Sequence, residues 1–301
     1  FANMGKKIAF IVNPISGTSH KEKIVEYLRS RLDGSSIWNA VYYTTTSAQD
    51  PFNAAERFKN EGFDVVVAIG GDGTVNQIAK ALIDSDVRLG IIPVGSGNGM
   101  ARHLRIPMLY QKAVDVILDD KYKEIDAGKI NDQYFFCTAG LGFEAVVGAK
   151  FNSAGTRGLF TYMETCTKEY LKYRREHYEI DIDGHIFSTK AFLITFANCA
   201  QWGNNAFIAP AADASDGMLD MVIWKRAPLV YMPVLTAELF LKTIMYSEYI
   251  DTYRCKRVVI RRERDGLIQF DGESSSMGRD IVATIHPKAL KVIVSSLTES
   301  V

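Results

Sequence analysis

The stretch Val65-Val66-Val67-Ala68-Ile69-Gly70-Gly71-Asp72-Gly73-Thr74-Val75-Asn76 decides the fold of this chain. Its apolar first half predicts a buried strand, and Val75–Leu82 predicts a helix that begins after the glycine turn. A helix N-terminus offers unpaired backbone N–H groups and the positive end of the helix dipole, so phosphate binds there readily. The glycines let a polyphosphate approach the backbone closely, and Asp72 adds a carboxylate where phosphate and Mg²⁺ would meet. The stretch therefore favours a nucleotide-dependent phosphotransferase.

The segments on either side of this stretch alternate between strand and helix patterns. Strand-like runs are expected at residues 7–12, 38–44 and 88–93, and helix-like runs at 21–32 and 51–61. A second glycine turn, Gly95–Gly99, follows the last of these strands. This order predicts an N-terminal α/β domain with a parallel, nucleotide-binding sheet, whose loops gather at one edge.

The pattern changes after about Asp126, where short strand-like segments separated by turns dominate. They are expected at residues 134–138, 178–182, 186–196, 219–224, 255–261 and 267–270, with helical stretches near 161–174 and 229–246. We therefore predict a C-terminal, mostly antiparallel β-sandwich domain over residues 126–286. The N-terminal domain is expected to cover residues 1–125, with 287–301 returning to it.

Composition excludes several other classes of protein. The 301 residues contain 35 basic and 35 acidic side chains, so the formal net charge of zero gives no support for a nucleic-acid binder. The four cysteines lack the CxxC spacing of a zinc cluster, and no apolar run reaches the roughly 18 residues that a membrane span needs. We expect a cytoplasmic protein that binds a membrane surface peripherally during turnover.

Four further motifs each have a functional and a structural interpretation. Asn13–Gly17 follows the first strand and suits phosphate or ribose contact, or else it is a plain turn and helix cap. Asn98 lies in the second glycine turn, which is a potential phosphate nest. The loop Pro210–Asp220 contains three carboxylates that suit a hard cation, or it is an acidic turn before a strand. Asp271-Gly272-Glu273 offers carboxylates for acid–base chemistry, or an Asp-Gly hairpin turn.

Together, and in this order, the motifs resemble the diacylglycerol kinase catalytic family, which includes bacterial lipid kinases and, more distantly, sphingosine and ceramide kinases. Gly70–Asn76 looks like its nucleotide loop, and Gly95-Ser96-Gly97-Asn98 like its G-[ST]-x-N turn. Gly140-Leu141-Gly142-Phe143 resembles the glycine motif of its second domain. Asp216–Asp220 and Asp271–Glu273 look like its late acidic motifs.

The resemblance implies ATP and Mg²⁺ as cofactors and assigns roles to particular residues. Asp271 would be the general base, with Asp72 as a competing candidate, and Asp72 and Glu273 would bind or orient the Mg²⁺ water network. Asp216, with the carbonyl groups of Asp213 and Met218, would hold a structural metal. The nucleotide would contact Asn13, Pro14, Ser16, Gly17, Thr44, Gly70, Gly71, Asp72, Gly73, Thr74, Asn76, Ser96 and Asn98.

The function implied is an ATP- and Mg²⁺-dependent lipid kinase that phosphorylates a hydroxyl of diacylglycerol or a related lipid. The partners would be ATP and a lipid substrate at a membrane surface, with a homodimer left open. Gln77 and Gly99 replace a Glu and an Asp that are usual in the family, and the Gly-Ser-Gly-Asn turn also resembles the sphingosine and ceramide kinase branch. The alternatives are therefore a sphingoid-base or ceramide kinase, an NAD kinase, and a non-catalytic nucleotide-binding regulator.

Overall fold

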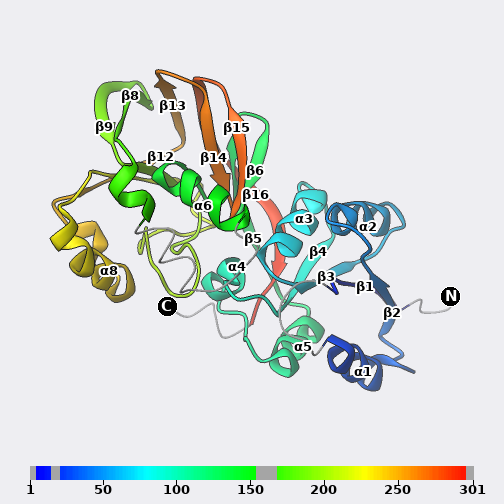
Figure 1. The fold of residues 1–301 in the computed structure, drawn as a ribbon. Coiled ribbons are helices and arrows are strands. Elements are labelled where there is room, and N and C mark those ends of the chain that lie inside the picture. Colours follow the sequence, from blue (N-terminus) through cyan, green and yellow to red (C-terminus); the bar gives the residue numbers. More distant parts are fainter. Residues whose placement is uncertain (1–4, 15–20, 154–167, 296–301) are drawn as a thin grey trace. The chain divides into compact units, whose positions relative to one another are not determined.

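The computed structural model of the chain (Figure 1) describes residues 5–14, 21–153 and 168–295. The chain divides into two compact units, Phe1–Ile125 with Lys288–Val301, and Asp126–Pro287. Ser16 and Gly17 lie outside the described residues, as does much of the helix expected near residues 161–174.

The first unit is built on a parallel sheet whose strands follow the order β2-β1-β3-β4, with the last residues of β16 beside β4. Helices α1 and α5 lie on one face of this sheet and α2 and α3 on the other (Figure 1). Its elements are β1 (Lys6–Val12), α1 (Lys21–Leu32), β2 (Trp38–Thr44), α2 (Asp50–Asn60), β3 (Val65–Gly70), α3 (Asp72–Leu82), β4 (Arg88–Pro93), α4 (Gly99–His103) and α5 (Tyr110–Asp119). The N-terminal α/β domain expected from the sequence is confirmed.

Strand register brings the ends of the four strands to one edge of the first sheet. Val12 pairs with Thr44 on one side and Ile69 on the other, and Gly70 pairs with Pro93. Every residue of β3 is buried, because helices cover both faces of the sheet. The loops that follow β1, β3 and β4 therefore start from a rigid, shared edge.

The second unit is a sandwich of two antiparallel sheets. One follows the order β12-β11-β10-β7-β14-β15, and the other the order β16-β13-β8-β9. The strands and helices that follow α5 in the chain are β5 (Tyr122–Ile130), β6 (Gln133–Phe135), β7 (Thr138–Gly142), α6 (Phe143–Ser153), β8 (Glu176–Ile182), β9 (His185–Ala191), β10 (Leu193–Ala197), β11 (Leu219–Trp224), η1 (Leu229–Tyr231), α8 (Met232–Leu241), η2 (Ile244–Tyr246), β12 (Ile250–Cys255), β13 (Arg257–Arg262), β14 (Gly266–Phe270), β15 (Glu273–Met277) and β16 (Asp280–Ile293).

A single apolar core joins the two sheets of the sandwich. Ile194 and Phe196 of one sheet pack in the same buried cluster as Tyr178, Ile180 and Ile260 of the other. The opposite face of the β12–β15 sheet is covered by α6 and α8, which contribute to a second cluster. The predicted antiparallel sandwich is confirmed, and the central strands β7, β10 and β11 of one sheet are buried on both faces.

Three expected segments differ from the structure. Residues 134–138 form the end of β6 and the start of β7, and 186–196 form β9 and β10, which belong to different sheets. Residues 229–246 divide into η1, α8 and η2, because the backbone at Lys242 turns left-handed (φ 62°) and ends α8. Within the described residues, no helix is both long and apolar enough to cross a membrane.

Candidate functional site

The first motif and the glycine loop meet at the edge of the parallel sheet. Asn13 follows β1, and its Nδ2 donates a hydrogen bond of 2.9 Å to Oγ1 of Thr74 in the first turn of α3. A Cβ at Gly70 would lie 2.5 Å from the Thr74 side chain, so glycine is needed where β3 turns into α3. The packing of Thr74 thus explains the first glycine of the loop.

Asp72 ties the glycine loop to the second glycine turn. Its Oδ2 accepts the backbone N–H of Asn98 at 2.8 Å, and its Oδ1 accepts that of Gly99 at 2.7 Å. The backbones approach closely here, since a Cβ at Gly95 would lie 2.6 Å from the Cα of Gly71. The loop aspartate therefore has a structural contact that the sequence did not predict.

The second glycine turn is held in shape by the side chain of Asn98. Its Oδ1 accepts the N–H of Gly95 at 3.0 Å, and its Nδ2 donates to the Gly95 carbonyl at 2.7 Å. Asn98 has a left-handed backbone (φ 52°), which Asn tolerates better than most residues. Ser96, at the tip of this turn, is exposed.

The first unit therefore gathers most of the predicted nucleotide contacts at one sheet edge. α3 begins at Asp72, so its first N–H groups lack helical partners and its dipole is positive there. Thr44 is exposed at the end of β2, whereas Thr45 is buried and donates its N–H to the Val12 carbonyl. Pro14 is exposed and Asn76 is buried within α3. Such an edge suits a polyphosphate.

In the second unit, Asp271 lies in a two-residue hairpin turn. Phe270 and Glu273 pair across β14 and β15, and Asp271 and Gly272 connect them with positive φ of 47° and 95°. Both carboxylate oxygens of Asp271 accept backbone N–H groups of the segment that leads into β7 and of its first residue. The donors are Phe136 (2.8 Å), Cys137 (2.8 Å) and Thr138 (3.0 Å).

The Asp-Gly hairpin interpretation is thus correct, and it does not conflict with an acid–base role. Three N–H donors stabilise the ionised carboxylate and fix its position. The same segment separates β6 from β7, which explains why the single strand expected over residues 134–138 is interrupted. Glu273, the first residue of β15, is exposed.

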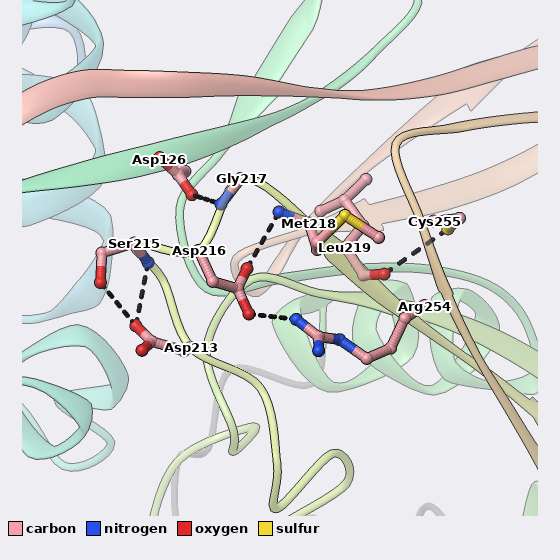
Figure 2. A network of polar contacts seen from close by, with 9 residues as sticks. All are labelled: Asp126, Asp213, Ser215, Asp216, Gly217, Met218, Leu219, Arg254 and Cys255. Atoms are coloured by element: carbon pink, nitrogen blue, oxygen red, sulfur yellow. Dashed lines mark hydrogen bonds and ion pairs between the residues drawn. The ribbon is translucent and has the colours of Figure 1, made fainter.

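The acidic loop before β11 forms a network of polar contacts (Figure 2). Oδ1 of Asp213 accepts from the backbone N and Oγ of Ser215 at 3.0 and 2.7 Å. Oδ1 of Asp216 accepts the Met218 N–H at 2.9 Å, and its Oδ2 pairs with the Arg254 guanidinium. The positive charge next to Asp216 is therefore supplied by Arg254.

These contacts bear on the metal predicted at Asp213, Asp216 and Met218. Among the residues described, no group of three or more His, Cys, Asp or Glu side chains is arranged to hold a metal ion. The predicted ligand set relies on two backbone carbonyls besides one carboxylate, and that carboxylate faces an arginine. The metal at this loop stays a prediction.

Four buried polar residues near these motifs were not predicted. Asp126 accepts the N–H of Gly217 at 2.7 Å, and Asn198 donates to the carbonyls of Asp126 and Phe136 at 2.8 Å (Figure 2 shows the first contact). Glu144 and Thr195 are hydrogen-bonded to each other. Of these four residues, only Glu144 could have been identified from the sequence, because it is an acidic residue directly after the glycine motif at 140–143.

Comparisons with known proteins place most of the chain within described families. The family model "Diacylglycerol kinase catalytic domain" matches residues 7–130, and the model "YegS C-terminal NAD kinase beta sandwich-like domain" matches residues 137–294. Diacylglycerol kinase of Bacillus subtilis is 31% identical over 280 residues, which cover 90% of this chain and 91% of that protein. Diacylglycerol kinase of Mycobacterium tuberculosis is 28% identical over 260 residues, 84% of each chain.

A solved structure supports the fold. The crystal structure of a diacylglycerol kinase from Bacillus anthracis superposes with a TM-score of 0.77 at 19% identity, over 98% of this chain and 99% of the other. At 19% identity the superposition supports the fold alone, namely the α/β unit and the β-sandwich unit described above.

Proposed function

Because the chain belongs to the diacylglycerol kinase catalytic-domain family, we propose that it transfers the γ-phosphate of ATP to a hydroxyl group of diacylglycerol or a related lipid. The observation that carries the proposal is the paired hydrogen bonding of Asp72 to Asn98 and Gly99. It holds two glycine turns together beside the N-terminus of α3, where a polyphosphate would be bound.

The first unit would bind the nucleotide. Backbone N–H groups of Gly71, Gly73 and Thr74 would donate to phosphate oxygens, and the exposed Ser96 hydroxyl would add a donor. Asn13 would act mainly by holding Thr74 in place. Phosphoryl transfer depends chiefly on positioning and on neutralising charge, which such a rigid edge supplies.

The second unit would supply the base. A lipid hydroxyl is a poor nucleophile until its proton is accepted, and Asp271 is the carboxylate that we assign to this step. Three backbone hydrogen bonds fix the orientation of its carboxylate, whose oxygens are hydrogen-bond acceptors. Glu273 would assist from the exposed start of the next strand.

Magnesium would neutralise charge on the transferring phosphate when bound with ATP. Kinases hold Mg²⁺ through one or two carboxylates together with the substrate phosphates, so a dedicated protein cage is not needed. Asp72 is the carboxylate beside the phosphate-binding turns and is the residue we assign to this contact, with Glu273 as the second.

An apolar surface over η1, α8 and η2 supports peripheral attachment to a lipid bilayer. Val230, Leu241 and Tyr246 are 83%, 70% and 82% exposed. Arg226 and Lys242 stand near the two ends of α8, and Glu238 is the only acidic residue in the segment 226–243. Apolar side chains flanked by cations suit an anionic membrane surface.

The test is a transfer assay with γ-labelled ATP, Mg²⁺ and lipids in mixed micelles. The acceptors are diacylglycerol, monoacylglycerol, ceramide, sphingosine and phosphatidylglycerol, with NAD as a soluble comparison. Labelled phosphatidate supports the proposal, and a labelled ceramide or sphingosine moves the substrate to the sphingoid branch. Label on NAD alone would reject the lipid assignment, and ATP binding without any labelled product would indicate a regulator.

A further inference from the structure

Glu144 is a buried carboxylic acid with no role in the function proposed above. It lies in the first turn of α6 and is 9% exposed. Its carboxyl group occupies the space over Gly140 of β7, where an added Cβ would lie only 2.1 Å from Oε2 of Glu144. The absence of a side chain at residue 140 is therefore what allows Glu144 to lie against the sheet.

Two neighbouring strands place partners on either side of that carboxyl group. Gly140 pairs with Thr195 of β10 and with Gln269 of β14, so the three residues form a row across the sheet. Thr195 donates its hydroxyl to Oε2 of Glu144. Nε2 of Gln269 donates a hydrogen bond of 3.2 Å to Oε1 of Glu144 when the carboxamide is oriented so that its nitrogen and its oxygen both have hydrogen-bond partners.

The other end of the Gln269 carboxamide reaches the hairpin turn. Its oxygen accepts the backbone N–H of Gly272 at 2.6 Å, directly after Asp271. A second link joins the same elements, since Ser274 Oγ of β15 donates to the Ala145 carbonyl of α6 at 3.3 Å. The first turn of α6 is thus connected twice to the hairpin that holds Asp271.

We propose that Glu144 is a positioning residue, which orients Gln269 and through it the Asp271-Gly272 turn. A carboxamide can rotate so that its oxygen and nitrogen exchange places, and only an acceptor such as the Glu144 carboxyl fixes the orientation that presents oxygen to Gly272. Without that acceptor, the Gln269 NH₂ group can face the Gly272 N–H, donor against donor. The inference rests on the proposed function, because it takes Asp271 as the base.

The energetics of Glu144 are consistent with this role. Burial raises the pKa of Glu144 to about 7, although the hydrogen bond from the Thr195 hydroxyl opposes the rise. A carboxyl group that is costly to ionise does not stabilise the core by its charge. It accepts the Gln269 hydrogen bond in either protonation state, so the orientation of the carboxamide persists across neutral pH.

The test compares Glu144→Met, which removes the acceptor and keeps the volume, with Glu144→Gln, which keeps an amide oxygen. We expect Glu144→Met to lower kcat by about 10- to 100-fold, as small displacements of a catalytic group do, with KM for ATP unchanged. Hydrogen–deuterium exchange of a peptide over residues 268–276 should become faster. Glu144→Gln should restore both properties to within about threefold of the starting protein, because its amide oxygen restores most of that positioning.

Two further variants keep the inference testable. Gln269→Met should reproduce both effects, and the double variant should be no worse than either single one, because the residues act in one chain of contacts. Glu176→Met is the matched control: this glutamate of β8 accepts hydrogen bonds from Tyr173 and Tyr178 and should leave the 268–276 peptide unchanged. If Glu144→Met does not fold, Gln269→Met decides.

The outcomes separate this inference from the proposed function. Unchanged kcat and unchanged exchange in Glu144→Met would overturn it, and so would faster exchange with unchanged kcat. If the starting protein phosphorylates no acceptor, the proposed function fails. In that case faster hydrogen exchange in Glu144→Met still supports the chain of contacts from Glu144 to Gly272. Unchanged exchange in Glu144→Met rejects that chain of contacts.

Discussion

The carboxylate of Asp72 and the backbone of Gly99 are joined by a hydrogen bond of 2.7 Å, from N–H of Gly99 to Oδ1 of Asp72. Gly99 begins α4, so an aspartate of the first glycine loop stabilises the N-terminus of the helix that follows the second one. Asp72 therefore connects the two glycine turns, and a substitution at Asp72 affects both of them.

Asp72→Asn should therefore reduce both stability and catalysis. The amide offers one acceptor and one donor where the carboxylate offered two acceptors, so one of the N–H groups of Asn98 and Gly99 faces a donor. Hydrogen bonds to charged groups contribute about 1.5–3 kcal/mol, and we expect a loss of unfolding free energy in that range. Denaturant unfolding measures it. Asp115→Asn, which affects an exposed pair with Arg31, should change stability by less than about 1 kcal/mol.

Asp271→Asn should remove the base and weaken the hairpin without undoing it, because the amide NH₂ faces one of the N–H groups that the carboxylate now accepts. Asn-Gly is also a favoured two-residue hairpin turn, so the variant should fold. We expect kcat to fall by about 10²- to 10⁴-fold with ATP binding retained, as is typical when a general base is lost. Initial rates and ATP titration measure the two effects. A rate within a few-fold of the starting protein would reassign the base, with Asp72 as the next candidate.

The metal predicted at Asp216 can be tested through its arginine partner. Arg254→Met removes the guanidinium beside Asp216, so Mg²⁺ should then raise the melting temperature more than it does in the starting protein. A ligand present at about 100 times its Kd stabilises by about 2.7 kcal/mol, which is easily detected by calorimetry. Arg261→Met, which affects an exposed pair with Glu179, is the control. If neither Mg²⁺ nor chelation shifts the melting temperature of either protein, the metal prediction is wrong.

Glu144 should make the folded protein more stable at acidic pH than at neutral pH. Its pKa in the folded protein, about 7, lies above its ordinary value of 4.5, so the folded state binds the proton more tightly. Stability from this group is therefore present below pH 4.5 and is lost as pH rises to 7, by up to about 3 kcal/mol. Glu144→Gln should remove this slope, and melting temperatures of both proteins across this pH range measure it. Parallel curves would show that Glu144 titrates normally.

The apolar surface over η1, α8 and η2 should bind vesicles. Val230→Glu combined with Leu241→Glu should abolish sedimentation with anionic liposomes, because two charges replace two strongly exposed aliphatic side chains of this surface. Ile186→Glu is a suitable control, since Ile186 is 66% exposed on β9. Equal sedimentation of the double variant and the control would place the membrane contact elsewhere.

Much of the fold followed from the sequence because its signals were local. The alternation of strands and helices predicted the parallel sheet. The rule that loops gather at one edge agrees with the contacts of Asn13 with Thr74 and of Asn98 with Asp72. The sequence predicts one continuous strand over 186–196, because no Gly or Pro marks the point near Phe192 where the chain passes from β9 in one sheet to β10 in the other. Local propensity is the same in both sheets, so only tertiary packing shows the break.

The polar contacts were not predictable in the same way. That Asp72 binds Asn98, or that Asp271 binds Phe136, depends on pairs separated by 26 and 135 residues. The row of Thr195, Gly140 and Gln269 depends on strand register, which single-sequence patterns do not specify between distant strands. The motifs predict the chemistry, and strand register determines which side chains lie beside them.

The return of the chain end to the first unit restricts how the protein can be dissected. Val292 of β16 pairs with Leu89, the N–H of Asp84 donates to the Ala289 carbonyl, and Lys291 pairs with Asp86. A fragment that stops at Ile125 would leave β4 as a bare edge strand, open to self-association. The first unit is therefore not expected to be stable when it is expressed alone by simple truncation at Ile125. It would need residues 288–295 rejoined to it by a linker or by circular permutation.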